Sequence, residues 1–172
     1  MLTLIRAAAG CKDKELDGKY LARAVVSVGN TVLTASADIT VKRKRLFVVK
    51  AAGETGELTL YLMSGADAPQ NSQVHIPDDT YEMIVSHDDI EEYLKISGDT
   101  NPVHTGECPV VPGFLMLMKL IPHTNISADA RFYMPVYSGE RLYVRAEKTC
   151  ITVYSERGIA LQVKININQL KL

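Results

Sequence analysis

Short apolar runs separated by turn residues dominate the first third of the chain. β-branched residues are frequent in these runs, which favours strands over helices. The spacing predicts one hairpin that joins residues 20–28 and 31–41 across Gly29-Asn30, and a second that joins residues 46–49 and 58–62. We therefore expect this part of the chain to be built of strands and to lack a helix, apart from a short turn near its start.

A polar stretch of small residues follows at positions 64–73 and has the character of a linker. Beyond it, Tyr81 to Val85 is typical of a strand, and a helix is expected next. Ser86 is suited to cap this helix, with Asp89 at the third helical position as in a capping box. Gly98 is suited to end it in the left-handed conformation.

A second helix is predicted to begin at Pro112, whose missing N–H costs nothing at that position. Residues 113–121 are apolar almost all round, so this helix should be buried. Three strands are expected after it, at residues 130–134, 140–152 and 159–167. The pattern as a whole predicts an α+β architecture in which an antiparallel sheet wraps one buried helix.

Composition narrows the class of protein. The chain has 172 residues, of which 47% are hydrophobic and 23% charged, as is ordinary for a soluble globular protein. A net charge of -1 gives no general attraction to nucleic acid or an anionic membrane. We expect no membrane span and no secretory leader. The three cysteines are scattered, which argues against a disulfide framework or a zinc site and favours a cytoplasmic location.

The first candidate for chemistry is a carboxylate and an imidazole five residues apart, Asp99 and His104. The Asn101-Pro102 turn between them can direct both side chains to one point. Such a pair can hold a water molecule and transfer its proton, since histidine titrates near neutral pH. Cys108 is close in sequence, but nothing around it favours a reactive thiolate, and we interpret it as a small buried residue.

The second candidate is the start of the helix at Pro112-Gly113. Free N–H groups at a helix N-terminus stabilise an oxygen that gains negative charge, and glycine allows a ligand carbonyl to approach the main chain. An equally tenable interpretation is that Gly113 only permits close helix packing. A base beside an oxyanion site is what hydration of an α,β-unsaturated thioester requires.

The octapeptide Ser97-Gly98-Asp99-Thr100-Asn101-Pro102-Val103-His104 resembles the signature of the (R)-specific enoyl-CoA hydratases, the MaoC-like branch of the hot-dog superfamily. The resemblance extends over about half of the chain. Further matches follow in the same order along it: Val111-Pro112-Gly113-Phe114-Leu115, Arg131-Phe132, Pro135-Val136 and Gly139.

This resemblance implies a hot-dog fold and reversible addition of water to a trans-2-enoyl thioester. Asp99 and His104 would be the catalytic acid/base residues, and Asn101 a positioning residue. The N–H of Gly113 would hold the thioester carbonyl, while pocket residues would include Ser97, Val111 and Phe114. The family uses no metal or redox cofactor, and coenzyme A or acyl carrier protein would enter as part of the substrate.

The N-terminal part shows a weak similarity to the C-terminal strands, since residues 18–28 are similar in pattern to residues 139–151. We therefore predict a double hot-dog with a degenerate first half that has lost its helix. The predicted division is a degenerate half at 1–63, a linker at 64–79 and the catalytic domain at 80–172. Such a chain would be a pseudo-dimeric monomer; otherwise a homodimer is expected.

Two departures from the family pattern leave alternatives open. Val110 stands where the family usually has a small residue, and the segment between His104 and Pro112 is shortened, as in acyl-carrier-protein dehydratases. A hot-dog acyl-CoA thioesterase would use a similar fold and a carboxylate to direct water at the carbonyl. A non-catalytic subunit that binds acyl thioesters is the other alternative.

Overall fold

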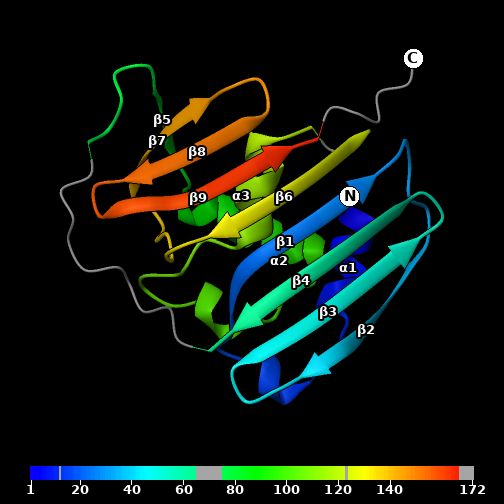
Figure 1. The fold of residues 1–172 in the computed structure, drawn as a ribbon. Coiled ribbons are helices and arrows are strands. Elements are labelled where there is room, and N and C mark those ends of the chain that lie inside the picture. The colour runs from blue at the N-terminus through cyan, green and yellow to red at the C-terminus, as the bar shows by residue number, and fades with distance from the viewer. Residues whose placement is uncertain (12, 65–74, 123, 167–172) are drawn as a thin grey trace.

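The computed structural model describes residues 1–11, 13–64, 75–122 and 124–166. Its centre is a nine-stranded antiparallel sheet in the order β2-β3-β4-β1-β6-β9-β8-β7-β5 (Figure 1). The strands are β1 (Tyr20–Val28), β2 (Ala35–Lys42), β3 (Leu46–Gly53), β4 (Gly56–Met63), β5 (Tyr81–Ile84), β6 (Ile126–Phe132), β7 (Arg141–Ala146), β8 (Cys150–Ser155) and β9 (Gly158–Ile165).

Three α-helices lie on one face of this sheet, α1 (Leu2–Ala9), α2 (His87–Ser97) and α3 (Gly113–Leu120) (Figure 1). Helix α3 is buried as expected, because its apolar side chains belong to the same buried cluster as side chains of the sheet and of α2. Short 3₁₀ turns occur at Lys14–Leu16 and Pro102–His104. The described part of the chain is therefore a sheet curved around its helices, with the core between them.

The predicted hairpin between residues 20–28 and 31–41 is wrong. Strand β1 pairs with β4 on one side and with β6 on the other, so neither of its edges is free for β2. At its centre Val26 is opposite Leu58 in β4 and Ala128 in β6. The second predicted hairpin is confirmed, because β3 and β4 pair in register from Leu46↔Met63 to Gly53↔Gly56.

Helix α1 corrects the expectation of a helix-free N-terminal part. Its buried residues Leu4, Ile5 and Ala8 form an apolar stripe that packs on β2, β3 and β4. The helix has only eight residues, too few for its period to stand out in the sequence. The structure thus gives the N-terminal strands a helical cover of their own.

The expected long strand at residues 140–152 is two strands instead. Residues 147–149 turn between β7 and β8, and the N–H of Glu147 donates to the carbonyl of Cys150 at 2.8 Å. The charged pair Glu147-Lys148 stands at the turn, where solvent can reach it. This turn brings β8 back beside β7 and extends the sheet toward β5.

The signals at the ends of α2 are confirmed. Ser86 accepts a hydrogen bond from the N–H of Asp89 at 3.1 Å, and the carboxylate of Asp89 accepts from the N–H of Ser86 at 2.8 Å. Gly98 ends the helix at φ 73°, in the left-handed region. Because both ends are fixed, the segment that follows Gly98 leaves the helix in a defined direction.

The boundaries predicted at 1–63, 64–79 and 80–172 stay a prediction. Residues 65–74 of the expected linker lie outside the described residues. Pairing of β1 with β6 joins the two parts of the chain in one continuous sheet, as Figure 1 shows. An ion pair crosses this junction, with Arg23 and Asp129 in contact at 2.7 Å.

Candidate active site

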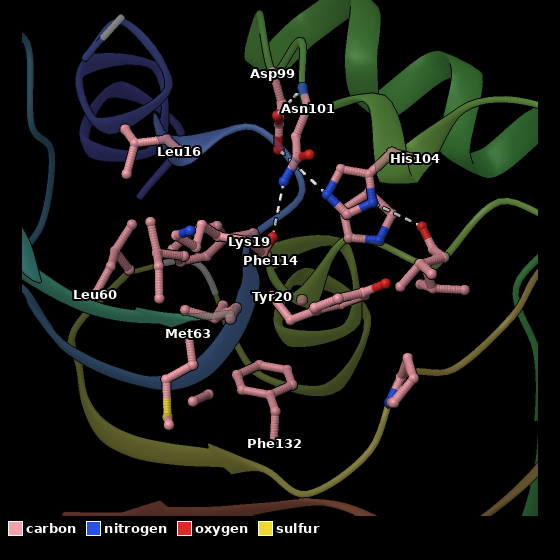
Figure 2. Close-up of a pocket in the computed structure, with 18 of the residues that line it drawn as sticks. Leu16, Lys19, Tyr20, Leu60, Met63, Asp99, Asn101, His104, Phe114 and Phe132 are labelled. Atoms are coloured by element: carbon pink, nitrogen blue, oxygen red, sulfur yellow. Dashed lines mark hydrogen bonds and ion pairs between the residues drawn. The ribbon is translucent and has the colours of Figure 1, made fainter. Parts of the chain in front are cut away.

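A cavity of about 770 Å³ lies between the sheet and the helices, and both parts of the chain line it. Figure 2 shows Asp99, Asn101 and His104 grouped at one side of this cavity, with apolar side chains such as Phe132 and Met63 across from them. The structure therefore brings the predicted polar residues together at the wall of an apolar chamber.

Backbone geometry after α2 fixes Asp99. Its N–H donates to the Ser97 hydroxyl at 3.2 Å, and its Oδ1 accepts from the N–H of Asn101 at 3.0 Å. These bonds occupy the main chain and one carboxylate oxygen. The other oxygen, Oδ2, faces His104.

The imidazole of His104 is held from the opposite side. Its Nδ1 lies 2.7 Å from the carbonyl oxygen of Val110. A carbonyl only accepts hydrogen bonds, so Nδ1 carries a proton and, in the neutral ring, Nε2 keeps its lone pair. Val110 has a larger side chain than the family usually has at this position, but the contact with His104 uses the main-chain carbonyl and does not depend on that side chain.

Nε2 of His104 lies 3.7 Å from Oδ2 of Asp99. This separation is too long for a direct hydrogen bond. A water molecule or a substrate hydroxyl placed against both atoms can interact with each of them. With 11% of the His104 side chain and 25% of the Asp99 side chain exposed, the two atoms face the cavity more than bulk solvent.

The side chain of Asn101 joins the loop to the N-terminal part of the chain. Its Oδ1 accepts from the N–H of Gly18 at 3.1 Å, and its Nδ2 donates to the carbonyl of Lys19 at 2.9 Å. Its Oδ1 also faces the N–H of Val103 at the start of the 3₁₀ turn that carries His104. Asn101 thus fixes both the loop and the start of β1.

At the start of α3, Val111, Gly113 and Phe114 line the cavity, and their predicted contact with substrate stays a prediction. A Cβ on Gly113 would lie 2.7 Å from Cδ2 of Leu21 and 3.0 Å from the ring of Phe132. Any larger residue here would force the Leu21 or Phe132 side chain to move, so glycine favours close packing of α3 against the sheet. A role for its N–H in binding a thioester carbonyl stays a prediction.

Two residues are placed differently from the expectation. Ser97 is buried behind Asp99 and is not among the residues that line the cavity, so its hydroxyl supports the Asp99 backbone; a role in binding substrate stays a prediction. Cys108 was expected to be buried and is exposed, because the shortened segment after His104 runs over the surface.

Residues 13–22 also contribute to the cavity, which nothing in the sequence predicted. Leu16, Lys19, Tyr20 and Leu21 line it. Figure 2 shows Leu16, Lys19 and Tyr20 on this segment, which bonds to the Asp99 loop through Asn101. The register of β1 against β4 shifts between Leu21 and Arg23, near the start of the strand. No motif marks these residues, and about eighty positions separate them from Asp99 in the chain.

Within residues 1–11, 13–64, 75–122 and 124–166, no group of three or more His, Cys, Asp or Glu side chains is arranged to hold a metal ion. None of the helices within those ranges is long and apolar enough to cross a bilayer.

Comparisons with known proteins identify the fold. No protein-family profile and no curated protein sequence matches the chain. HtdX of Mycobacterium tuberculosis superposes with a TM-score of 0.59 at 15% identity, covering 92% of this chain and 79% of that protein. A MaoC-like dehydratase from Phytophthora capsici gives a TM-score of 0.56 at 15% identity, covering 94% of this chain and 74% of its own.

A protein assigned as thioesterase II from Thermobifida fusca YX gives a TM-score of 0.50 at 10% identity, covering 96% of this chain and 84% of its own. These similarities confirm the predicted α+β hot-dog fold. The degenerate second unit in the N-terminal part stays a prediction.

Proposed function

We propose that this protein is a MaoC-like hydratase or dehydratase that adds water to a trans-2-enoyl thioester and catalyses the reverse reaction. The observation that carries the proposal is the gap of 3.7 Å between Nε2 of His104 and Oδ2 of Asp99 at the wall of an apolar cavity. A gap of this size suits a shared water molecule or the 3-hydroxyl group of the product. The octapeptide and the similarity to a MaoC-like dehydratase support the same reaction.

In the hydration direction, water bound between Nε2 of His104 and Oδ2 of Asp99 gives a proton to the imidazole. Its oxygen forms a bond with the β-carbon, and the electrons of the double bond move to the thioester carbonyl oxygen. The imidazolium then returns the proton to the α-carbon. The contact of Nδ1 with Val110 keeps Nε2 as the atom that accepts and returns this proton.

The rest of the cavity suits the acyl part of such a substrate. Apolar side chains from α3 and from both parts of the sheet form most of its wall. Burying an acyl chain there gains about 0.8 kcal/mol for each CH₂ group, which favours thioesters over small acids. Coenzyme A and acyl carrier protein are both proposed as carriers of the acyl group, and no further cofactor is required.

The test follows the loss of enoyl absorbance when purified protein is mixed with trans-2-enoyl-CoA substrates of several chain lengths. Wild-type protein should form the 3-hydroxyacyl-CoA. Asp99→Asn and His104→Ala should each lower kcat/KM by about 10²–10⁴-fold, as expected when an acid–base group is lost. Asp88→Asn and His87→Ala are matched controls, because both residues are exposed on α2.

Two results would contradict the proposal. Release of free thiol without hydration would make the protein a thioesterase, the activity assigned to one of its structural neighbours. Saturable binding of acyl thioesters, with no turnover on either coenzyme A or carrier-protein substrates, would make it a non-catalytic binding protein. Loss of activity in the control variants as well would show that the substitutions act through folding.

A further inference from the structure

A run of positive charge lies where the chain turns from β2 to β3. It consists of four exposed side chains, Lys42, Arg43, Lys44 and Arg45. Lys42 ends β2, and the three residues after it form what we call the cationic turn. Two main-chain hydrogen bonds between Arg43 and Leu46, at 2.9 and 3.2 Å, close this turn. Its three side chains are therefore carried by a fixed backbone.

The charges of the cationic turn are not neutralised within the described part of the chain. Lys42 pairs with Asp13 at 2.9 Å and with Glu15 at 3.0 Å, whereas no ion pair between described residues involves the three side chains of the turn. Charged residues on an edge strand such as β2 commonly prevent its pairing with another chain. The turn lies beyond the last paired residue of β2, so edge protection does not account for it.

The cationic turn lies at the rim of the cavity. It is at the end of the sheet where β4 ends and β1 begins (Figure 1). The carbonyl of Arg45 accepts from the N–H of Ser64 at 3.2 Å, directly after Met63, which lines the cavity and is 42% exposed. On its other side, Lys42 holds Asp13, which also lines the cavity.

A short series of contacts connects this rim to the catalytic loop. Lys42 is opposite Phe47 in the β2–β3 pair, and Nζ of Lys19 lies 5.2 Å from the centre of the Phe47 ring. The carbonyl of Lys19 accepts from Nδ2 of Asn101 at 2.9 Å, and the N–H of Asn101 donates to Asp99. Neighbouring strands lie about 4.8 Å apart, so the turn is about 10–15 Å from the start of β1. A ligand whose negative charge is well removed from its reactive group can therefore contact both places.

The pattern of charge at the rim favours a small polyphosphate over an acidic protein. Guanidinium groups bind phosphate through paired N–H donors, and the turn presents two of them with an ammonium group between. Glu15 and Asp17 are exposed beside the cations. A broad acidic surface laid over the rim would meet these carboxylates as well, whereas phosphate groups can contact the cationic turn alone.

We propose that coenzyme A carries the acyl group and that the cationic turn binds its phosphate groups. This inference rests on the proposed function, which places the thioester beside Asp99 and His104. The pantetheine arm separates the phosphates of coenzyme A from the thioester, so the nucleotide end lies on the rim while the acyl chain fills the cavity. Binding at the turn is equal in the ground state and the transition state, so it lowers KM and leaves kcat unchanged.

Titration calorimetry with free coenzyme A tests this site without turnover. The triple variant Arg43→Gln/Lys44→Gln/Arg45→Gln removes three charges from exposed positions. We expect its affinity for coenzyme A to be about tenfold lower at low salt. Wild-type affinity should fall as salt is raised, because exposed charges are screened. Equal affinity of the wild type and the triple variant, or no binding by the wild type, would overturn the proposal.

A matched control removes the same charge from other parts of the surface. The combined variant Lys50→Gln/Lys148→Gln/Lys164→Gln changes three exposed lysines that do not line the cavity. Its affinity for coenzyme A should stay within about twofold of the wild type. A loss as large as that of the triple variant would assign the effect to net charge and overturn the role of the cationic turn.

The kinetic arm compares two substrates that have the same acyl group. With crotonyl-CoA, the triple variant should have a KM about tenfold higher and an unchanged kcat. With crotonyl-pantetheine, which has no phosphate, the wild type and the triple variant should have equal constants. A higher KM for an enoyl-acyl carrier protein but not for crotonyl-CoA would overturn the assignment to coenzyme A. If the wild type binds coenzyme A through the turn but hydrates no enoyl thioester, the proposed reaction fails and the binding site stands.

Discussion

Gly113 lies where side chains from both parts of the chain meet the start of α3. It begins α3, and the side chains of Leu21 from β1 and Phe132 from β6 fill the space where its Cβ would lie. The same residue was predicted to present its N–H to a thioester carbonyl. Packing and binding roles can be separated by changing Gly113 together with one of its neighbours.

We expect Gly113→Ala to lower the free energy of unfolding by about 1–3 kcal/mol, because the added methyl group overlaps Leu21. Leu21→Ala in the same chain should relieve the overlap. The double variant should therefore lose less stability than the sum of the single variants in urea denaturation. If the losses of stability in the two single variants simply add in the double variant, the methyl group of Ala is accommodated by movement of residues other than Leu21.

At the scale of elements, Asp89 joins the two helices that frame the site. Its carboxylate caps α2 through Ser86 and contacts Nζ of Lys119 in α3 at 2.8 Å. The hydrogen bond from Lys119, followed by that from the Ser86 N–H, lowers the pKa of Asp89. The folded protein therefore binds this proton less readily than the unfolded chain does.

A depressed folded-state pKa stabilises the protein at a pH above the unfolded value, and this contribution is lost as the pH falls through the folded value. We expect Asp89→Asn to cost about 1 kcal/mol near neutral pH. The difference from wild type should shrink below about pH 4, where the unfolded carboxyl takes up a proton. Urea denaturation at several pH values measures it.

Asp88→Asn is the control for the helix position, since Asp88 is exposed in the same first turn. It should change stability by only a few tenths of a kcal/mol. A loss for Asp89→Asn that is the same at every pH would contradict the assignment to charge and would point to altered packing between α2 and α3.

At the scale of the whole molecule, the sheet makes the two parts of the chain one unit. Strand β1 lies at the junction, paired with β4 of its own part and with β6 of the other. Residues from both parts line the cavity, and Asn101 bonds to the main chain at Gly18 and Lys19. Unfolding of either part would therefore expose the core of the other.

We expect the two parts to unfold in one cooperative transition. Val26→Ala, at a buried position in β1, should lower the opening free energy by about 1–3 kcal/mol. Native-state hydrogen exchange measures the opening free energy at each backbone amide. The decrease caused by Val26→Ala should be equal for amides in β4 and in β9. A decrease confined to β4 would contradict this prediction and show that the N-terminal part opens by itself.

Local signals in the sequence were enough to predict several elements. Ser86, Asp89 and Gly98 mark the ends of α2 because caps act on the backbone within a few residues. The turn at residues 53–56 predicts the β3–β4 hairpin, since strands that are adjacent in sequence tend to pair. Helix α1 was missed because eight residues give a weak period.

The sequence did not predict which strands pair with one another, or which residues of the N-terminal part line the cavity. No local feature of the sequence specifies that β1 pairs with β4 and β6, because many strands offer equivalent backbone hydrogen bonds. The place of Tyr20 in the cavity depends on that pairing. Tyr93 was recognised as part of the apolar face of its helix, but its place in the cavity wall exists only in the folded chain.

The sequence by itself therefore determined the α+β hot-dog class and placed Asp99, Asn101 and His104 in one short loop, because caps, turns and a compact motif are local in the chain. Only the tertiary structure decided what faces that loop: the β1 start that bonds to Asn101, the Val110 carbonyl that orients His104, and the Leu21 side chain that packs against Gly113. The physical reason is that pairing across the sheet and packing of side chains are long-range. Each contact is fixed by all the others together rather than by its own neighbours in sequence.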